Sequence, residues 1–454
     1  LHPSFPRKRE STTRPPSACP ASNRCKFCNG SKGRQGTGEE IMSHRAVTLG
    51  SIAKISSGGT PDRQNPAYWN GDIPWAKTAQ IQNCTITADD IDEWITQEGL
   101  EQSSARIIPK GTILMAMYGQ GKTRGQVAIL GQDAAINQAC AAIYLRQGVD
   151  RDYVYQQLRF RYESIRALSN TGSQENLNAE LIREIAFPLP EQHEQEAIAQ
   201  RLVVWDASIE KTERLIAAKR QRNEALSNRL LFGHARFGQR NTKTTRALHW
   251  FSAPSDWQVV EIGKVAREVS ALNSSSGDLP VLSCTKHDGL VDSFEYFDKK
   301  VFSHDTSKSK VVRHGQFAYA TNHIEEGSIG YQDLVPAGLV SPIYTVFQAD
   351  AEQIDDSYFY KLLKTEKMRQ IFAAQTNASV DRRGSLRWKE FARIHIPLPP
   401  LDEQREISAV LDEAKREVAL LQTQLAALKT QKRGLMQKLL TGQWRVKMAK
   451  TEAG

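Results

Sequence analysis

The chain has 454 residues, of which 40% are hydrophobic and 24% are charged, and its formal net charge is +9. This composition is ordinary for a globular protein and excludes collagen-like, wholly disordered and disulfide-framework chains. No apolar run approaches the ~20 residues that a membrane-spanning helix needs, so we expect no membrane partner. At roughly 100–200 residues per domain, the length predicts two or three domains.

Residues 1–41 differ from the rest of the chain. They show no hydrophobic period, and their eight Lys and Arg residues against three Glu give a net charge of +5. Met42 stands just before the first patterned segment, so we interpret this tail as disordered sequence upstream of the natural start. The alternative is a small zinc module at Cys25 and Cys28, although no second ligand pair follows at a suitable spacing. The absence of a signal sequence and the scattered cysteines favour a cytoplasmic protein with reduced thiols.

Two segments, 46–184 and 256–393, are rich in short alternating runs that are typical of strands. Thr112–Tyr118 in the first and Gln316–Ala320 in the second are the clearest examples. Each segment also has a Tyr-x-Tyr triplet late in its length, where we expect a helix to start. Residues 238–255, which are polar and basic, are interpreted as a linker.

Each of these two segments is followed by a copy of the same element. Ile185–Pro190 reads IAFPLP and Ile394–Pro399 reads IHIPLP, 209 positions later. The register then holds without a gap for more than forty residues, through Glu-Gln pairs, leucines and a closing glycine. A duplicated element therefore occupies 185–237 and 394–447.

Both copies carry a heptad pattern, which predicts two long helices that pair as an antiparallel coiled coil. Lys432 is the one polar interruption of the second row, and Asn223 is one of three polar members in the first. Gly233 and Gly442 lie where each helix should stop. The expected seam consists of Ile198, Leu202, Trp205, Ile209, Ile216, Leu226 and Leu230, and of Leu411, Ala414, Val418, Leu421, Leu425, Leu428, Leu435 and Leu439.

The sequence contains partial matches to two catalytic motifs, and neither is complete. Gly119–Thr123 ends like a phosphate-binding loop, but Ala116 occupies the position of the first glycine. Asn65–Tyr68 resembles the Asn-Pro-Pro-Tyr tetrapeptide of amino-methyltransferases but lacks the second proline, and no glycine-rich cofactor loop precedes it. No metal-ligand or nuclease pattern is found. The chain is predicted to bind a partner and not to catalyse a reaction.

Residues 46–447 resemble the specificity subunit of type I restriction-modification systems. The resemblance rests on Ser57–Pro61 (SGGTP), Tyr68-Trp69, Ile73–Trp75 (IPW), the Tyr118-Gly119 loop and the two Pro-Leu-Pro…Glu-Gln helices taken together. The second segment lacks the Gly-Gly-Thr-Pro and Ile-Pro-Trp motifs, which weakens residue assignments there.

The resemblance implies an α+β fold, with two similar α/β target recognition domains each followed by a long spacer helix. It implies that each domain reads one half of a split site in double-stranded DNA. Two methyltransferase subunits and the restriction subunits would be the protein partners. S-adenosylmethionine, ATP and Mg²⁺ would belong to those partners, and none to this chain.

Candidate DNA contacts follow from side-chain chemistry, since Lys and Arg reach phosphate or guanine and glycine lets a backbone approach its partner. The basic stretches 211–246 and 429–447 are a further option, as phosphate contacts, as a solvated helix surface or as a subunit interface. The candidates are Lys77, Thr78, Tyr118, Lys122, Thr123, Arg124, Ser173 and Gln174 in the first segment, and Thr321, Asn322, His323, Arg382 and Arg383 in the second.

The main hypothesis is therefore a non-catalytic reader of a bipartite, asymmetric DNA sequence that directs methyltransferase and restriction subunits to it. The alternative is a scaffold, a degenerate or orphan copy, whose coiled coil mediates assembly without productive DNA recognition. A catalytic function is the third hypothesis.

Overall fold

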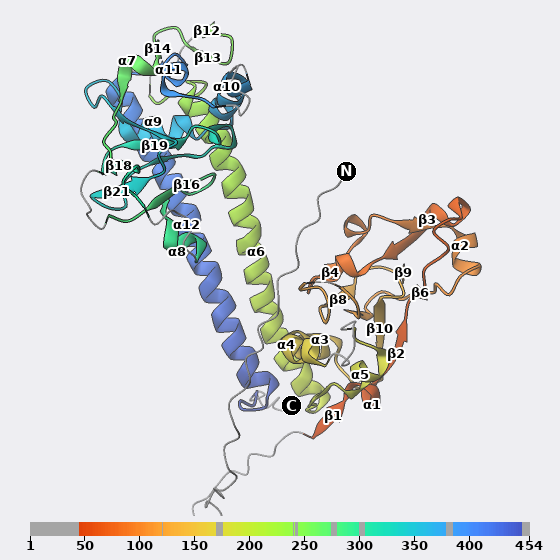
Figure 1. Ribbon diagram of the computed structural model, residues 1–454. Helices are drawn as coiled ribbons and strands as arrows, with labels where there is room; N and C mark the ends of the chain where they lie inside the picture. Colours follow the sequence, from red (N-terminus) through yellow and green to blue (C-terminus); the bar gives the residue numbers. More distant parts are fainter. Residues whose placement is uncertain are drawn as a thin grey trace, which may run out of the picture. The chain divides into compact units, whose positions relative to one another are not determined.

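The computed structural model describes residues 45–119, 121–168, 176–238, 240, 244–273, 279–298, 305–377 and 385–446 (Figure 1). The tail 1–41 lies outside these residues. The described part is α+β, with two mixed domains and two long helices, α6 (Gln192–Leu231) and α12 (Leu401–Leu440). Among the described residues, no helix combines the length and apolarity needed to span a membrane.

The first domain is built around a sheet in the order β2-β10-β7-β8-β4, beside a second sheet in the order β5-β3-β9-β6. The central strand β7 is buried at all four positions, as its apolar run in the sequence predicts. The elements are β1 (Ala46–Thr48), α1 (Leu49–Ile52), β2 (Ala53–Ser57), β3 (Trp69–Ala76), β4 (Thr85–Ile86), β5 (Trp94–Ile95), α2 (Gln97–Glu101), β6 (Ile107–Ile108), β7 (Ile113–Ala116), β8 (Val127–Leu130), β9 (Ala134–Ile136), β10 (Cys140–Leu145), α3 (Arg151–Phe160), α4 (Tyr162–Ala167), α5 (Ala179–Glu184) and β11 (Ala186–Pro188).

The second domain repeats the main sheet, in the order β15-β22-β19-β20. Strand β19 takes the place of β7, and helix α9 takes the place of α3, so the Tyr-x-Tyr triplets lie in the first turns of corresponding helices. The elements are β14 (Gln258–Glu261), α7 (Ile262–Val265), β15 (Ala266–Glu268), β16 (Leu282–Thr285), β17 (Gly289–Asp292), α8 (Ser293–Phe297), β18 (Lys310–Arg313), β19 (Phe317–Ala320), β20 (Ile329–Tyr331), β21 (Ala337–Val340), β22 (Tyr344–Ala349), α9 (Asp356–Leu363), α10 (Glu366–Asn377), α11 (Trp388–Phe391) and β23 (His395–Leu398).

The boundaries differ from the sequence prediction in two places. The start of each predicted helical segment is a strand, because β11 pairs with β1 and β23 pairs with β14 at the base of its domain. Part of the predicted linker is a hairpin, in which β12 (Thr245–Ala247) pairs with β13 (Ser252–Pro254). Trp250 and Phe251 at this hairpin pack against the core of the second domain, and this packing explains why the segment is ordered despite its polar composition.

The two long helices are α6 (Gln192–Leu231) and α12 (Leu401–Leu440), called here the helix pair. Both end at the predicted glycines, where Gly233 has φ +71° and Gly442 has φ +75°, left-handed conformations that favour glycine. A Cβ on Gly233 would also lie 2.3 Å from Pro254, so this turn has no room for a side chain.

The helix pair runs antiparallel and side by side (Figure 1). Ion pairs join Asp206 to Lys432, Glu213 to Lys429 and Lys219 to Glu417. The residue numbers on α6 rise while those of their partners on α12 fall, as expected for antiparallel helices. Every residue of the predicted seam is buried or half-buried. Val204 and Leu420, which lie off the seam and away from the domains, are exposed.

Each domain closes its core with both long helices. The first-domain core includes Ile198 and Leu202 from the start of α6 and Leu439 and Leu440 from the end of α12. The second-domain core includes Leu230 and Leu231 from the end of α6 and Ile407 and Leu411 from the start of α12. The helix pair and the two domains therefore depend on one another for burial.

The 209-residue repeat also produces two reciprocal ion pairs. Arg236, just beyond α6, makes a bidentate pair with Glu403 at the start of α12, with both N–O distances 2.7 Å. Arg445, just beyond α12, makes the equivalent pair with Glu194, with both distances 2.8 Å. The first pair is buried, whereas the Arg445 side chain is 51% exposed. Hydrogen bonds to Glu403 raise the pKa of Arg236 and hold it charged.

Lys432, the polar interruption of the second apolar row, takes part in an ion pair with α6. Its side chain is only 6% exposed and donates to Asp206 on α6, which also accepts from Arg159 on α3 at 2.8 Å. Burial, with Arg159 nearby, lowers the pKa of Lys432 to about 8. Burial opposes ionisation of Asp206, but Arg159 and Lys432 overcome it and lower its pKa.

Replacing Glu403 by Gln should lower the free energy of unfolding by roughly 3 kcal/mol, because it leaves the buried Arg236 charge with only the exposed Asp256 carboxylate. The matched change Glu194→Gln should cost about 1 kcal/mol or less, because water solvates Arg445. Urea unfolding followed by circular dichroism measures both. Equal losses would contradict the difference in burial proposed here.

The pH dependence of stability should reveal Lys432. Its pKa is about 8 in the fold against 10.5 for a free lysine, so between these values the unfolded chain binds more protons. The free energy of unfolding should therefore rise with pH in this window, by up to roughly 3 kcal/mol relative to Lys432→Met. Lys429→Met, which removes a half-exposed lysine from the same helix, is the control for the loss of one charge. A flat difference for Lys432→Met would refute the assignment.

Candidate nucleic-acid interface

The loop between β7 and β8 carries most of the first-domain candidates. Tyr118 and Lys122 are exposed and Thr123 is half-buried. The loop is held from behind by α4, because Arg166 Nη2 donates to the Gly121 carbonyl at 2.7 Å and Tyr162 Oη donates to the Lys122 carbonyl. These contacts fix the backbone while the Tyr118 and Lys122 side chains stay accessible, which suits a surface that contacts a polyanion.

Arg124 is placed differently from the prediction. Its side chain is 7% exposed and donates to the Arg166 carbonyl at 3.3 Å. It therefore supports the loop from inside and does not present its guanidinium at the surface. Gly125, with φ +82°, follows it and lets the chain turn back into β8 beside α4.

Lys77 and Thr78 begin a short 3-10 helix, Thr78–Gln80, after β3. Lys77 is already paired with Asp92 and Glu93, and its side chain is 22% exposed. Burial opposes the charge, but hydrogen bonds to Glu93 and Asp92 raise the pKa of Lys77 above its ordinary value. Lys77 is therefore compensated within the domain, whereas Thr78 is half-buried at the surface.

The Gly-Gly-Thr-Pro and Ile-Pro-Trp motifs form a supporting structure for this part of the domain. The Arg63 guanidinium lies 3.9 Å from the Trp69 ring centroid and 4.7 Å from that of Trp75, and it pairs with Glu93. The Trp75 indole donates to the Gly59 carbonyl at 3.0 Å. A Cβ on Gly59 would lie 2.3 Å from backbone atoms of Ser104 and Ala105, so only glycine fits. The motif is thus explained by packing.

The second domain places its candidates in the corresponding loop, between β19 and β20. Thr321 is half-buried and donates to the Ile343 carbonyl at 2.9 Å, and Asn322 is half-buried. His323 is exposed and its Nδ1 lies 3.2 Å from Glu326 Oε1. Arg369 of α10 donates to the Glu325 carbonyl at 3.0 Å. Arg166 of α4 makes the equivalent bond to the Gly121 carbonyl in the first loop.

The remaining candidates Ser173, Gln174, Arg382 and Arg383 lie outside the described residues. The structure describes the backbone again from residue 176 in the first domain and from residue 385 in the second. This backbone is anchored in the same way in both domains. Leu177 N–H donates to the Met117 carbonyl at 3.0 Å, and Leu386 N–H donates to the Thr321 carbonyl at 2.9 Å. The fold therefore joins the end of each segment to the start of the β7–β8 or β19–β20 loop.

The sequence prediction missed two features of these loops. Tyr162, Arg166 and Arg369 hold the loops from a neighbouring helix, a role that depends on tertiary contacts. Glu325 and Glu326 make the second loop acidic where the first is cationic. Ligand atoms of His323, Glu325 and Glu326 lie within 4.8 Å of one another, an arrangement that exposed acidic loops often show without a metal ion.

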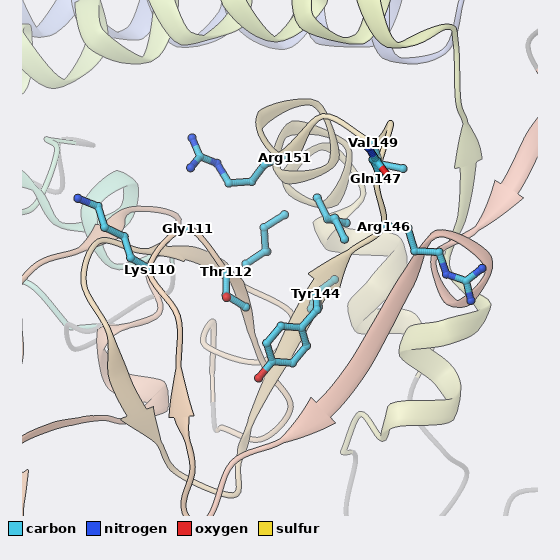
Figure 2. A pocket seen from close by; sticks show the side chains of 11 residues that line it. Lys110, Gly111, Thr112, Tyr144, Arg146, Gln147, Val149 and Arg151 are labelled. Carbon is cyan, nitrogen blue, oxygen red and sulfur yellow. The ribbon is translucent and has the colours of Figure 1, made fainter.

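A separate cationic hollow of about 360 Å³ lies at the other end of β7 (Figure 2). Lys110, Arg146 and Arg151 lie around it, and Arg151 also pairs with Asp152. In the second domain, Asp350 takes the backbone position of Arg146, as shown by the matching bonds from Arg146 N to Ile52 O and from Asp350 N to Val265 O. This surface therefore differs in charge between the domains, as the two loops do.

Several arginines and lysines in the basic stretches at the ends of the long helices form ion pairs within the described part of the chain. Arg222 pairs with Glu417, and Arg240 pairs with Asp402 and Glu406. Arg236 and Arg445 form the reciprocal pairs given above. The paired residues of the stretches 211–246 and 429–447 therefore serve the helix surface, whereas the exposed Arg220, Arg229 and Arg433 remain accessible to a phosphate.

Parts of the chain are similar in sequence to curated specificity subunits of type I restriction enzymes. Over 178 residues, the chain is 30% identical to the type I restriction enzyme MjaIX specificity subunit of Methanocaldococcus jannaschii, covering 38% of this chain and 39% of that protein. Over 165 residues, it is 28% identical to the EcoR124I/EcoR124II specificity subunit of Escherichia coli, covering 35% and 40%. These two alignments thus span about two-fifths of each curated relative.

Solved structures show the same fold over nearly the whole chain. The S subunit of a type I restriction-modification system from M. genitalium matches with a TM-score of 0.52 at 16% identity, covering 91% of this chain and 99% of that one. A chain from a structure of type I R-M complex assembly matches with a TM-score of 0.54 at 16% identity, covering 88% and 98%.

The family profile described as "Type I restriction modification DNA specificity domain" matches twice, at residues 45–219 and 254–430. Each match contains one mixed domain and most of the long helix that follows it. The chain therefore belongs to the type I restriction-modification DNA specificity domain family and carries two copies of that domain.

Proposed function

We propose that this chain is the DNA-reading specificity subunit of a type I restriction-modification complex. In this proposal, each domain reads one half of a bipartite, asymmetric site, and the helix pair sets the unread spacer between them. The observation that carries the proposal is the pair of equivalent loops, β7–β8 and β19–β20, which are anchored alike but differ in chemistry.

The difference in chemistry supports an asymmetric site. Lys122 and Tyr118 offer a cation and an aromatic ring, which suit phosphate and guanine acceptors. His323, Glu325 and Glu326 offer acceptors, and carboxylates suit the exocyclic amino group of cytosine. Two loops of opposite charge on the same scaffold would not read the same bases.

The helix pair supports a fixed spacing. Each helix has 40 residues, which corresponds to ~60 Å at 1.5 Å per residue. One turn of B-DNA is ~34 Å, so two readers tied to such a rod can address grooves one to one-and-a-half turns apart. Each domain core includes residues of both helices, which ties the domains to the ends of the helix pair.

The chemistry of modification and cleavage is assigned to partners. We infer that two methyltransferase subunits and the restriction subunits bind this chain in the cytoplasm, where they supply S-adenosylmethionine, ATP and Mg²⁺ chemistry. This chain would be non-catalytic and hold no cofactor. The absence of a recognisable catalytic motif in the sequence supports this division of labour.

Deleting the gene should abolish one split adenine-methylation motif in the cell, because the methyltransferase would lose its sequence reader. Single-molecule sequencing of methylated adenines in cells with and without the gene measures this. Restoring the gene on a plasmid is the control. Methylation that is unchanged by deletion would favour the scaffold alternative.

Replacing Lys122 by Ala should weaken DNA binding by the assembled complex and reduce the slope of log K against log salt by about 1, as expected for one lost phosphate contact. Lys110, an exposed lysine at the other end of β7, gives the matched control Lys110→Ala, which should leave both quantities unchanged. Fluorescence anisotropy at several salt concentrations measures them. Equal effects of the two changes would remove the β7–β8 loop from the interface.

A further inference from the structure

A reader of split sites must hold its domains at a defined angle. Adding one base pair to a spacer moves the second half-site by ~3.4 Å and rotates it by ~34–36°. A domain that rocks on the helix pair by a comparable angle would accept spacers of the wrong length. The contacts between each domain and the helix pair therefore bear on the proposed function, on which this inference rests.

Both domains share one anchor at the start of a long helix. Gln195 Oε1 on α6 accepts from the Asp150 N–H, which precedes α3, at 2.8 Å. Gln404 Oε1 on α12 accepts from the Asp355 N–H, which precedes α9, also at 2.8 Å. Further hydrogen bonds lie close to these anchors, from Gln157 Nε2 to the Leu440 carbonyl at 3.0 Å and from Gln404 Nε2 to the Gln353 carbonyl at 3.1 Å. Contacts near one end of a domain restrain its rotation less than a contact further along the helix.

The first domain has a second anchor further along α6. Asp206 accepts from Gln156 Nε2 at 2.7 Å and from Arg159 Nη1 at 2.8 Å, both on α3. Asp206 is eleven residues beyond Gln195, about 16 Å along the helix axis. Gln156 is buried, and the Arg159 side chain is 22% exposed. Charge-assisted hydrogen bonds with little exposure to water are strong and directional.

The same carboxylate is tied to the other long helix. Lys432 on α12 donates to Asp206 Oδ1, the atom that Arg159 also contacts. Asp206 therefore joins α3, α6 and α12 at one place. Arg159 and Gln156 link the domain to the helix pair, whereas Lys432 links the two helices to each other.

The second domain has a weaker counterpart. By the 209-residue offset, Lys415 stands where Asp206 stands in the first copy, so the carboxylate is absent. The nearest equivalent contact joins Lys361 of α9 to Asp412 of α12 at 2.8 Å, and Asp412 is 48% exposed. The Lys361 side chain is only 17% exposed, but water competes for the half-exposed Asp412 carboxylate, whereas Asp206 is 29% exposed.

We infer that Arg159 and Asp206 are positioning residues that fix the orientation of the first domain on the helix pair and so restrict the spacer length that the complex accepts. Arg159 is the sharper of the two to test. Its removal takes away the charged link to the domain, keeps the Gln156 hydrogen bond, and leaves the Asp206–Lys432 pair within the helix pair balanced.

The first experiment measures orientation without DNA. Genetically encoded spin labels at the exposed positions Gln102, in the first domain, and Gln424, on α12, report their distance distribution in the full chain by double electron–electron resonance. Arg159→Met should broaden this distribution about twofold, and Arg159→Lys, which keeps a charge but loses the planar fork, should broaden it less. The matched change Lys361→Met at the second domain should leave it unchanged. A distribution unaffected by Arg159→Met would overturn the inference.

The second experiment measures spacer discrimination by sequencing methylated adenines in cells that carry the partner subunits. Arg159→Met should reduce discrimination against sites one base pair longer or shorter about tenfold or more, with both half-sites unaltered in sequence. Lower methylation with unchanged spacer selectivity would mean a purely structural role and would sink the inference. Loss of a split motif from the wild-type complex would instead refute the proposed function. If Arg159→Met folds poorly by circular dichroism, Arg159→Lys carries both measurements.

Discussion

The structure depends on the mutual burial of two apolar seams that lie far apart in the sequence. Leu202 near the start of α6 and Leu439 near the end of α12 belong to one core, which also contains the strands of the first domain. The second domain closes its core in the same way with the opposite ends. Neither domain can bury its base until the last helix of the chain has packed against α6. Cooperative folding of the described part is the consequence, because breaking the helix pair exposes both cores.

Polar contacts give this apolar rod its direction and its register. A bidentate Arg–Glu pair lies at each end of the helix pair. Asn223 and Lys432, which the 209-residue repeat relates, interrupt the apolar seam. Asn223 donates to the Ala414 carbonyl at 2.7 Å, and Lys432 donates to Asp206. Buried polar groups of this kind add little stability compared with well-packed apolar residues, but a shifted register would leave them without partners. Apolar burial thus supplies the stability, while the polar contacts select one arrangement.

The two domains use one scaffold to present different chemistry. The main sheets share the order of four strands, and an arginine from a neighbouring helix bonds to the loop after β7 and to the loop after β19. Leu177 and Leu386 then donate to corresponding carbonyls in the two domains. On this common frame the loop side chains differ in charge, with the exposed Lys122 in one loop and the half-buried Glu325 and exposed Glu326 in the other. Variation is tolerated there because the loop backbone is held by bonds from neighbouring elements and not by its own side chains.

The sequence alone determined the duplication, the long helices, their stops and their seam, because a heptad pattern and a constant offset are local properties of the chain. It also located the strands before the candidate loops, from their continuous apolar runs. Tertiary structure decided which cations are available. Lys77 and Arg124 looked equivalent to Lys122 in sequence, yet Asp92 and Glu93 neutralise the first and α4 covers the second. Such partners lie tens of residues away, and only the folded chain shows which charge meets another and which faces water.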